Sequence, residues 1–229
     1  MAVDQALLAS ANADGQVTLR FYRWAPATLS LGYFQVADQR REHPPSSHCD
    51  LVRRTTGGGA ILHDRELTYS LCVPCTNRLS SSHQALYLQV HGAVIEALRD
   101  WGIEATLYSA GERAAANPPF LCFQRRSPGD IVLNGVKICG SAQRRLNAAI
   151  LQHGSILLAR SEFAPELQGV HEAAGFAVPA ATFQCRLTER ISQRLQLAFL
   201  PSNLHKREQF ISHEIQQNQF ARHDWNYRR

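Results

Sequence analysis

A glycine-rich segment at residues 53–64, RRTTGGGAILHD, is the first stretch whose residue types point to chemistry. Each glycine in a row of three weakens regular structure by roughly 1 kcal/mol relative to alanine. Such a backbone lets a substrate lie directly on the chain, and its N–H groups can line an anion or a carbonyl oxygen. The segment is not a Walker phosphate loop, because no Gly-Lys-Ser or Gly-Lys-Thr follows the glycines. We interpret Gly57–Gly59 as a substrate-binding backbone, with a plain glycine turn as the alternative.

A lysine is predicted to lie on a β-hairpin at residues 130–140, where Asn-Gly separates the apolar runs DIVL and VKIC. Asn-Gly favours a two-residue type I′ turn, and side chains alternate between the two faces of each strand. This register places Lys137 away from the core, diagonal to Asp130 and on the same face as Cys139. Lys137 and Asp130 form an exposed cross-strand ion pair in one interpretation. In the other, Lys137 lines a cleft and the carboxylate holds it in place.

Two further residues interrupt apolar stretches. Cys122 lies in PFLCF, where a lone cysteine most often packs but can also be a nucleophile. His153 lies in QHGS, where it is either a core histidine with a buried partner or the wall of a site. Cys72 and Cys75 have metal-like spacing, but no second Cys or His pair matches it. We interpret both as strand-end residues and expect no metal site.

The composition predicts a globular protein. Of the 229 residues, 45% are hydrophobic and 19% are charged, which excludes wholesale disorder. No apolar run approaches the roughly 20 residues of a membrane span. The opening MAVDQALLASANADG lacks the basic region of a signal peptide, so neither a membrane nor export is expected. Six cysteines are too few for a disulfide scaffold, so we expect free thiols and a cytoplasmic location.

The charge balance points to acidic partners, because the formal net charge is +5. Lys137 and Lys206 are the only lysines among the 24 basic residues. Arginine is nearly always charged whereas lysine can be tuned toward a neutral amine, so a lysine within a structured motif suggests a chemical role. No helix-turn-helix or RNA-binding signature is present, and we expect no nucleic acid partner.

The periodicity of the chain predicts one α+β domain over residues 1–229, with strands in the first two thirds and helices in the last. Alternation over 17–24 and 28–34 indicates a hairpin of two paired strands. A 3.6-residue apolar repeat predicts a helix over 82–101, and residues 108–119 are expected to form a loop. Further helices are expected at 2–9, 162–174, 188–200 and 206–222.

The segments RRTTGGGAILHDRELTYS, DIVLNGVKICGSAQRR and ILQHGSILL, in this order, resemble the biotin/lipoate protein ligase superfamily over nearly the whole chain. A Cys-Phe about fifteen residues before the lysine makes the chain similar to the cysteine-type octanoyltransferases of lipoate assembly. The resemblance implies a mixed β-sheet flanked by helices, with an acyl tunnel at the glycine-rich strand and the lysine hairpin. Members of the superfamily have a strand before the point where this chain begins, so an N-terminal strand is expected to be missing.

The resemblance also implies a reaction, the transfer of an octanoyl group from acyl carrier protein to a lysine of a lipoyl domain, such as glycine-cleavage H protein. Cys122 corresponds to the family's nucleophile and Lys137 to its lysine, and no cofactor is expected. The alternatives are a lipoate-protein ligase that uses ATP and magnesium, and a lipoyl-domain amidotransferase. Backbone N–H groups at the glycines, or at a turn formed by Gly140 and Ser141, are expected to hold the oxyanion. The residues assigned to substrate binding are Arg54, Gly57, Gly58, Gly59, His63, Gly140, Ser141 and His153.

Overall fold

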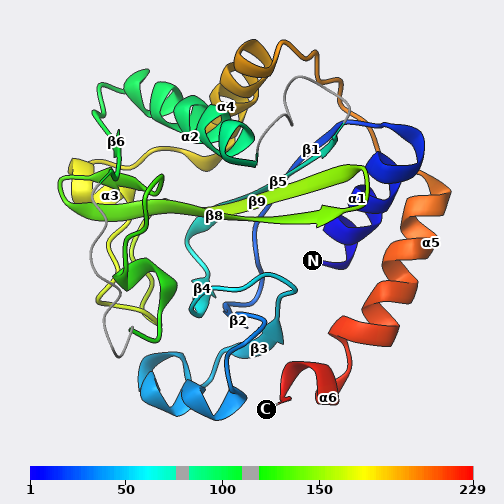
Figure 1. Cartoon of the computed structure of the whole chain (residues 1–229). Helices are drawn as coiled ribbons and strands as arrows, with labels where there is room; N and C mark the ends of the chain where they lie inside the picture. Colours follow the sequence, from blue (N-terminus) through cyan, green and yellow to red (C-terminus); the bar gives the residue numbers. More distant parts are fainter. Residues whose placement is uncertain (76–82, 110–118, 229) are drawn as a thin grey trace.

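A six-stranded antiparallel sheet forms the centre of the computed structural model, which describes residues 1–75, 83–109 and 119–228 (Figure 1). Each neighbouring pair of strands in it is antiparallel. β5 and β9 lie in its middle and are buried along almost their whole length. In sheet order the strands are β1 (Thr18–Tyr22), β5 (Glu66–Pro74), β9 (Ala149–Leu157), β8 (Val136–Leu146), β7 (Ile131–Leu133) and β6 (Thr106–Leu107).

A smaller sheet lies on the opposite side of the main sheet from helices α2 and α4 (Figure 1). Its strands are β3 (Asp50–Arg53), β2 (Thr28–Leu31) and β4 (Ile61–His63), with β2 parallel to β3 and antiparallel to β4. The predicted hairpin between 17–24 and 28–34 is therefore wrong, because β1 pairs with β5 instead. All four residues of β2 are buried, so this strand needs a partner along both edges, which the small sheet supplies.

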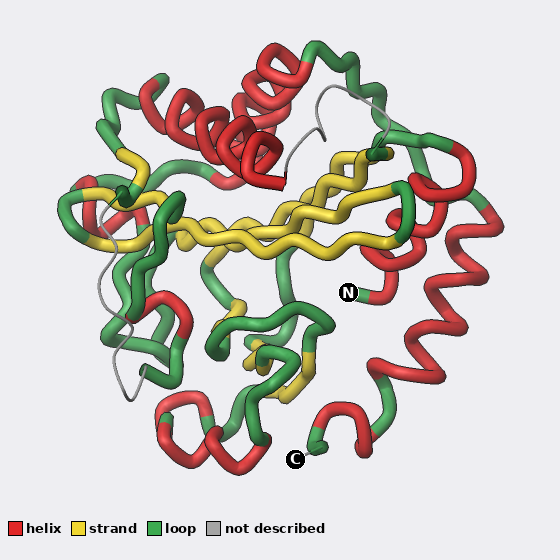
Figure 2. The backbone as a smooth tube through the Cα atoms, viewed as in Figure 1, coloured by secondary structure: helices red, strands yellow, loops and turns green. Residues whose placement is uncertain are grey.

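Helices cover the other face of the main sheet, as Figure 2 shows. α2 (His83–Arg99) confirms the helix predicted at 82–101, and α4 (Ala180–Leu195) packs beside it. α4 begins eight residues earlier than the predicted helix at 188–200. Its buried residues recur every four positions, at Phe183, Leu187, Ile191 and Leu195, which is the stripe of an amphipathic helix. The short α3 (Val170–Ala174) is all that remains of the helix predicted at 162–174.

The N-terminal helix packs on the two central strands of the main sheet. α1 (Ala2–Asp14) is longer than the predicted helix at 2–9 and ends at Gly15, whose φ of +68° suits glycine. α1 packs on β5 and β9, and α5 (Lys206–Ile215) lies against α1 (Figure 1). The predicted helix at 206–222 is split, since a π-helical turn η5 (Gln216–Phe220) follows α5. The short elements are η1 (Ala37–Glu42), η2 (Pro44–Ser46), η4 (Cys122–Gln124) and α6 (His223–Asn226).

The β7–β8 hairpin has the predicted two-residue turn, with positive φ at both Asn134 and Gly135. Its predicted register is confirmed for Leu133 with Val136 and for Val132 with Lys137, but it is wrong beyond them, because Ile131 pairs with Cys139 and not with Ile138. One extra residue in β8 forms a bulge, and the side chains beyond it change faces. Cys139 is consequently buried in the core beneath α2, instead of sharing a face with Lys137.

The described residues contain no helix that is both long and apolar enough to cross a membrane. The loop predicted at 108–119 falls mostly outside the described residues. Cys72 and Cys75 lie at the end of β5, as predicted, and all six cysteines are free thiols.

Phe183→Ala is expected to lower the free energy of unfolding by about 3–5 kcal/mol, because the ring is fully buried and its loss leaves a cavity. Urea denaturation of the purified protein measures this change. Phe210→Ala is the matched control, since that ring is 67% exposed and its removal should cost little. Equal losses for the two variants would contradict the packing of α4 on the sheet.

Candidate active site

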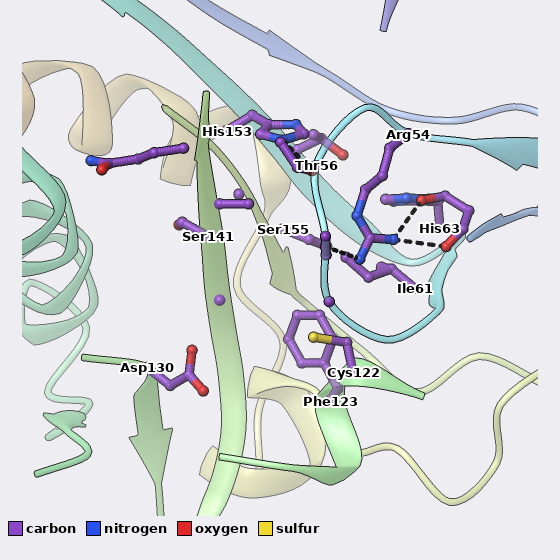
Figure 3. Close-up of a pocket in the computed structure, with 18 of the residues that line it drawn as sticks. Arg54, Thr56, Ile61, His63, Cys122, Phe123, Asp130, Ser141, His153 and Ser155 are labelled. Carbon is purple, nitrogen blue, oxygen red and sulfur yellow. Dashed lines mark hydrogen bonds between the residues drawn. The ribbon is translucent and has the colours of Figure 1, made fainter. Parts of the chain in front are cut away.

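A cavity of about 300 Å³ lies between the main sheet and the small sheet (Figure 3). The glycine-rich loop, the start of η4 and one face of β8 and β9 form its walls. The structure thus brings together segments that are up to a hundred residues apart in the sequence. Of the residues assigned to the site from the sequence, all line this cavity except Gly59.

Cys122 begins η4 and lies directly beside the glycine-rich loop. Its backbone N–H donates to the carbonyl of Ala60 at 2.7 Å, and Ala60 N–H donates to the carbonyl of Phe120 at 2.9 Å. These two bonds form a short parallel bridge between Ala60 and Leu121. A Cβ on Gly58 would lie 3.8 Å from the Cys122 sulfur, so the thiol lies directly beside this glycine. The residue is partly exposed, so a substrate can reach it.

Gly59 lies outside the cavity and has a packing role instead. A Cβ at this position would lie 2.9 Å from the Phe120 carbonyl oxygen and 2.0 Å from the guanidinium of Arg125. Glycine is therefore what allows the segment that carries Cys122 to approach the loop closely.

Lys137 reaches the same end of the cavity from β8. Its Nζ forms a 2.7 Å ion pair with Asp130, and both side chains are at most 5% exposed. The ion pair is thus buried in the cleft and is not the exposed cross-strand pair. Lys137 Nζ also lies 3.5 Å from the Cys122 carbonyl oxygen, while the backbone N–H of Ser127 donates to Asp130 at 2.7 Å. Asp130 therefore holds the ammonium group next to the cysteine.

Gly140 leaves the space that Lys137 occupies. A Cβ on Gly140 would lie 2.8 Å from Lys137 Cε and 3.2 Å from Asp130 Oδ1, which no ordinary contact permits. Gly140 and Ser141 do not form a turn, as the sequence analysis expected. They lie inside β8, paired with Ser155 and Gly154 of β9.

Arg54 places a second buried cation against the cysteine. Its guanidinium donates to the carbonyls of Gly57 and Gly59, both at 2.7 Å, and to that of Ser30 at 2.9 Å. Figure 3 shows this guanidinium among the residues of the cavity. Burial lowers the pKa of Arg54 to about 10, and the charge of Cys122 opposes this shift. Arg54 therefore shapes the glycine-rich loop and remains protonated at neutral pH.

His63 lines the far part of the cavity and is fixed by a buried carboxylate. His63 Nδ1 lies 2.6 Å from Glu66, which also accepts hydrogen bonds from Thr68 and Ser155. Within the described part of the chain, His63 Nε2 is buried without a hydrogen-bond partner. The ring of Trp24 stacks on His63, with centroids 4.3 Å apart and planes 17° from parallel.

His153 lies on the cavity wall and also has a hydrogen-bond partner. Its Nε2 lies 3.1 Å from Thr56 Oγ1, a residue of the glycine-rich loop. Burial lowers the pKa of His153 to about 4, with a further lowering by the charge of Arg54 and an opposing effect of Asp4. The imidazole is therefore neutral near pH 7.

Ser141 borders the cavity, but its hydroxyl group forms its hydrogen bonds on the helix-covered side of the main sheet. Ser141 Oγ lies 2.6 Å from Tyr69 Oη and 2.6 Å from His91 Nε2 of α2. Burial lowers the pKa of His91 to about 4, so this ring is also neutral. The network fixes β8 behind the ion pair of Lys137 with Asp130.

Three residues that line the far end of the cavity are not among those assigned to it from the sequence. Trp24 lies in the segment after β1, Thr68 in β5 and Ser155 in β9. Thr68 and Ser155 lie within segments that carry the family resemblance, but no residue pattern marks them as part of a site. The one local signal is the spacing of His63 and Glu66, which face each other across the tight turn between β4 and β5.

The comparisons with known proteins agree with this site. The family model of the lipoyl protein ligase A/B catalytic domain matches residues 1–170. Octanoyltransferase LipM of Brevibacillus brevis is 32% identical over 260 residues, which cover 100% of this chain and 94% of that protein. The chain belongs to the lipoyl protein ligase A/B catalytic-domain family. Octanoyltransferase LipM of Kyrpidia tusciae, 33% identical with 100% and 94% coverage, is a similar relative.

The fold of the family is also found in solved structures. A bi-partite lipoate protein ligase from Thermoplasma acidophilum superposes with a TM-score of 0.77 at 22% identity, covering 99% of this chain and 89% of that one. The resemblance drawn from the sequence motifs and the predicted mixed sheet with flanking helices are therefore confirmed.

Stability is expected to fall as the pH drops from about 6.5 to about 4, because His153 stays neutral in the folded protein. The unfolded chain binds a proton at this histidine in that range, whereas the folded chain does not. Each such histidine contributes up to about 1.4 kcal/mol per pH unit to the change of the free energy of unfolding with pH. Urea denaturation at pH 7 and at pH 5 measures how strongly the free energy of unfolding depends on pH. In His153→Gln this dependence should be weaker by the part that His153 contributes. An unchanged slope would contradict burial of a neutral ring.

Proposed function

We propose that this protein transfers an octanoyl group from acyl carrier protein to a lysine of a lipoyl domain, such as glycine-cleavage H protein, through a thioester on Cys122. The reaction belongs to cytoplasmic lipoate biosynthesis and needs no cofactor. One observation carries the proposal: a partly exposed cysteine lines a cavity that two buried cations, Lys137 and Arg54, also line. The octanoyltransferase relatives support the choice of acyl group.

In the first step the Cys122 thiolate attacks the carbonyl carbon of the donor thioester. A C–S bond forms at Cys122, the bond to the donor sulfur breaks, and the departing thiolate takes up a proton. A free cysteine is only a few per cent thiolate at neutral pH, so neighbouring positive charge favours the attacking form. We assign this role to Arg54, whose charge interacts with that of Cys122, and to Lys137, whose Nζ lies 3.5 Å from the Cys122 carbonyl oxygen.

In the second step the amine of the acceptor lysine attacks the thioester on Cys122. An amide bond forms, the acceptor nitrogen loses a proton and Cys122 leaves as a thiolate. Both steps pass through an oxyanion, and one well-placed donor to it is worth about 3–4 kcal/mol in other enzymes. The Lys137 ammonium, held by Asp130, and the backbone of Gly57–Gly59 are the groups we assign to this role.

The cavity suits an apolar tail attached at the cysteine. Burial of one methylene group is worth about 0.8 kcal/mol, so an eight-carbon chain supplies several kcal/mol of binding. The net charge of +5 suits acidic donor and acceptor domains, which would approach the open side of the cavity.

The proposal predicts an acyl-enzyme. Incubation with octanoyl-acyl carrier protein without ATP should add one octanoyl group to Cys122, detected by mass spectrometry of the intact protein and its peptides. Cys122→Ser should abolish both the adduct and the transfer, because an alkoxide forms far less readily than a thiolate. Cys139→Ser is the matched control. Its thiol lies in the core, where burial raises its pKa, and this variant should keep most activity.

Two outcomes would overturn the proposal. Transfer by Cys122→Ser that requires ATP and magnesium would identify a ligase that forms an acyl-adenylate. A thioester on Cys122 that forms from an octanoylated lipoyl domain, but not from acyl carrier protein, would identify an amidotransferase.

Lys137→Arg is expected to lower kcat at least about 100-fold although it keeps the positive charge. The planar guanidinium is larger than an ammonium group, and the space beside Gly140 is already filled by the lysine. The measurement is the steady-state rate of octanoyl transfer. Lys206→Arg, on the exposed N-terminal turn of α5, is the matched control and should behave like the wild type. Near-normal transfer by Lys137→Arg would remove this lysine from the catalytic machinery.

A further inference from the structure

The surface beside the glycine-rich loop carries an exposed aromatic ring. Phe34 follows β2 and is 84% exposed, and it does not line the candidate active-site cavity. Its ring lies 3.7 Å from the position of a Cβ on Gly57, while the Cys122 sulfur lies 3.8 Å from that of a Cβ on Gly58. The ring and the thiol therefore flank two consecutive glycines, with the ring on the outer side of the loop.

Buried hydrogen bonds hold the turn that carries this ring. Arg53 is fully buried, and its guanidinium donates to the carbonyls of Gly32, Tyr33 and Gln35. The Gln35 side chain in turn accepts from the Gly32 N–H at 2.9 Å, and the Gln35 N–H donates to the Gly32 carbonyl at 3.1 Å. A turn whose backbone groups are satisfied in this way keeps its shape, so Phe34 is a fixed projection.

The same turn contacts both segments that surround the thiol. The Tyr33 N–H donates to the Thr56 carbonyl of the glycine-rich loop at 2.9 Å. Gln35 Nε2 lies 3.5 Å from the carbonyl oxygen of Phe120, two residues before the cysteine. Phe34 is therefore held at a fixed place relative to the thiol, and a partner that binds the ring needs little ordering of this chain.

Positive charge accompanies the exposed ring. The Arg228 guanidinium stacks on the ring of Tyr33, 3.8 Å from its centroid, and that of Arg125 lies against Gly59. Within residues 1–75, 83–109 and 119–228 neither guanidinium is part of an ion pair. A single exposed apolar residue is common on proteins, but an aromatic ring among arginines beside a reactive thiol has the composition of an interface. The charge favours an acidic partner.

The two substrates of the proposed transfer approach the thiol differently. The donor carries its octanoyl group at the end of a long pantetheine arm, so the carrier protein itself need not touch the rim of the cavity. The acceptor lysine has five bonds of about 1.5 Å between Cα and Nζ, which reach about 6 Å when extended. The backbone of the acceptor domain must therefore come within about 6 Å of the acyl carbon, where its surface covers the rim beside the glycines.

We propose that Phe34 is the contact on which the acceptor lipoyl domain docks, with Arg125 and Arg228 supplying positive charge to the same surface. This inference rests on the proposed acyl transfer, because that reaction brings the acceptor lysine to Cys122. It adds the surface that recognises the acceptor, which lies outside the cavity that holds the acyl group.

The test separates the two half-reactions in wild type and Phe34→Ala. In the variant, kcat/KM for unmodified H protein should fall at least about tenfold, while octanoyl-enzyme formation from octanoyl-acyl carrier protein should stay within about twofold of wild type. Transfer from the octanoyl-enzyme to Nα-acetyl-lysine amide should be unchanged, because this acceptor has no domain to dock. That result also excludes a damaged site.

Leu200→Ala is the matched control. Leu200 is 85% exposed, lies between α4 and α5 and does not line the cavity, so both half-reactions should match wild type. Phe34→Tyr keeps the ring and should keep most of the kcat/KM for H protein.

Two results would show a different role for Phe34. The inference is wrong if Phe34→Ala leaves kcat/KM for H protein unchanged, or if it slows octanoyl-enzyme formation as strongly, because the ring then serves the donor or the fold. A wild-type dimer in analytical ultracentrifugation that Phe34→Ala dissociates would identify a second copy of this chain as the occupant instead.

Calorimetric titration of unmodified H protein into wild type and Phe34→Ala separates docking from the proposed function. Weaker binding to the variant supports the docking surface even if no octanoyl group is transferred, and in that case only the proposed transfer fails. Equal binding to the two proteins, or no binding to wild type, overturns the inference whatever the transfer assay shows.

Discussion

The parallel bridge between Ala60 and Leu121 is the contact on which the site depends. Its two backbone hydrogen bonds join the glycine-rich loop to the segment that carries Cys122, some sixty residues further along the chain. Both bridge residues are fully buried, so water does not compete for these bonds. Gly59 permits the close approach, and the Cys122 thiol then lies directly beside Gly58. Without this bridge the cysteine would have no fixed position relative to either cation.

Burying charge is expensive, and each buried charge here is compensated in a way that fixes its place. Lys137 is paired with Asp130, which is held in turn by the Ser127 amide. Arg54 is compensated by backbone carbonyls instead of a carboxylate, so it keeps its net positive charge beside the cysteine. Removing one member of such a set would leave an unpaired buried group, which costs several kcal/mol. The polar groups therefore hold their positions before a substrate arrives, as electrostatic stabilisation of an oxyanion requires.

The main sheet acts as both scaffold and floor. Its helix-covered face carries the apolar core, and its other face carries small residues, Gly140, Ser155 and Thr68, at matching register positions. Because antiparallel pairing fixes which residues stand side by side, the composition of the cavity floor follows from the strand register. The Trp24 indole donates a hydrogen bond to Thr68, at one end of these three residues.

The sequence by itself determined those elements whose conformation depends on residues close together in the chain. The Asn-Gly turn before Lys137, the helix over His83–Arg99 and the glycine-rich loop follow from backbone preferences and apolar spacing. Only the tertiary structure decided the partners of β2, because any exposed strand edge can pair with another and burial chooses between them. It also decided that Cys139 belongs to the core, since a one-residue bulge depends on how β8 packs between two neighbours. The far wall that Trp24, Thr68 and Ser155 line is likewise assembled from distant segments, and such contacts leave no local pattern.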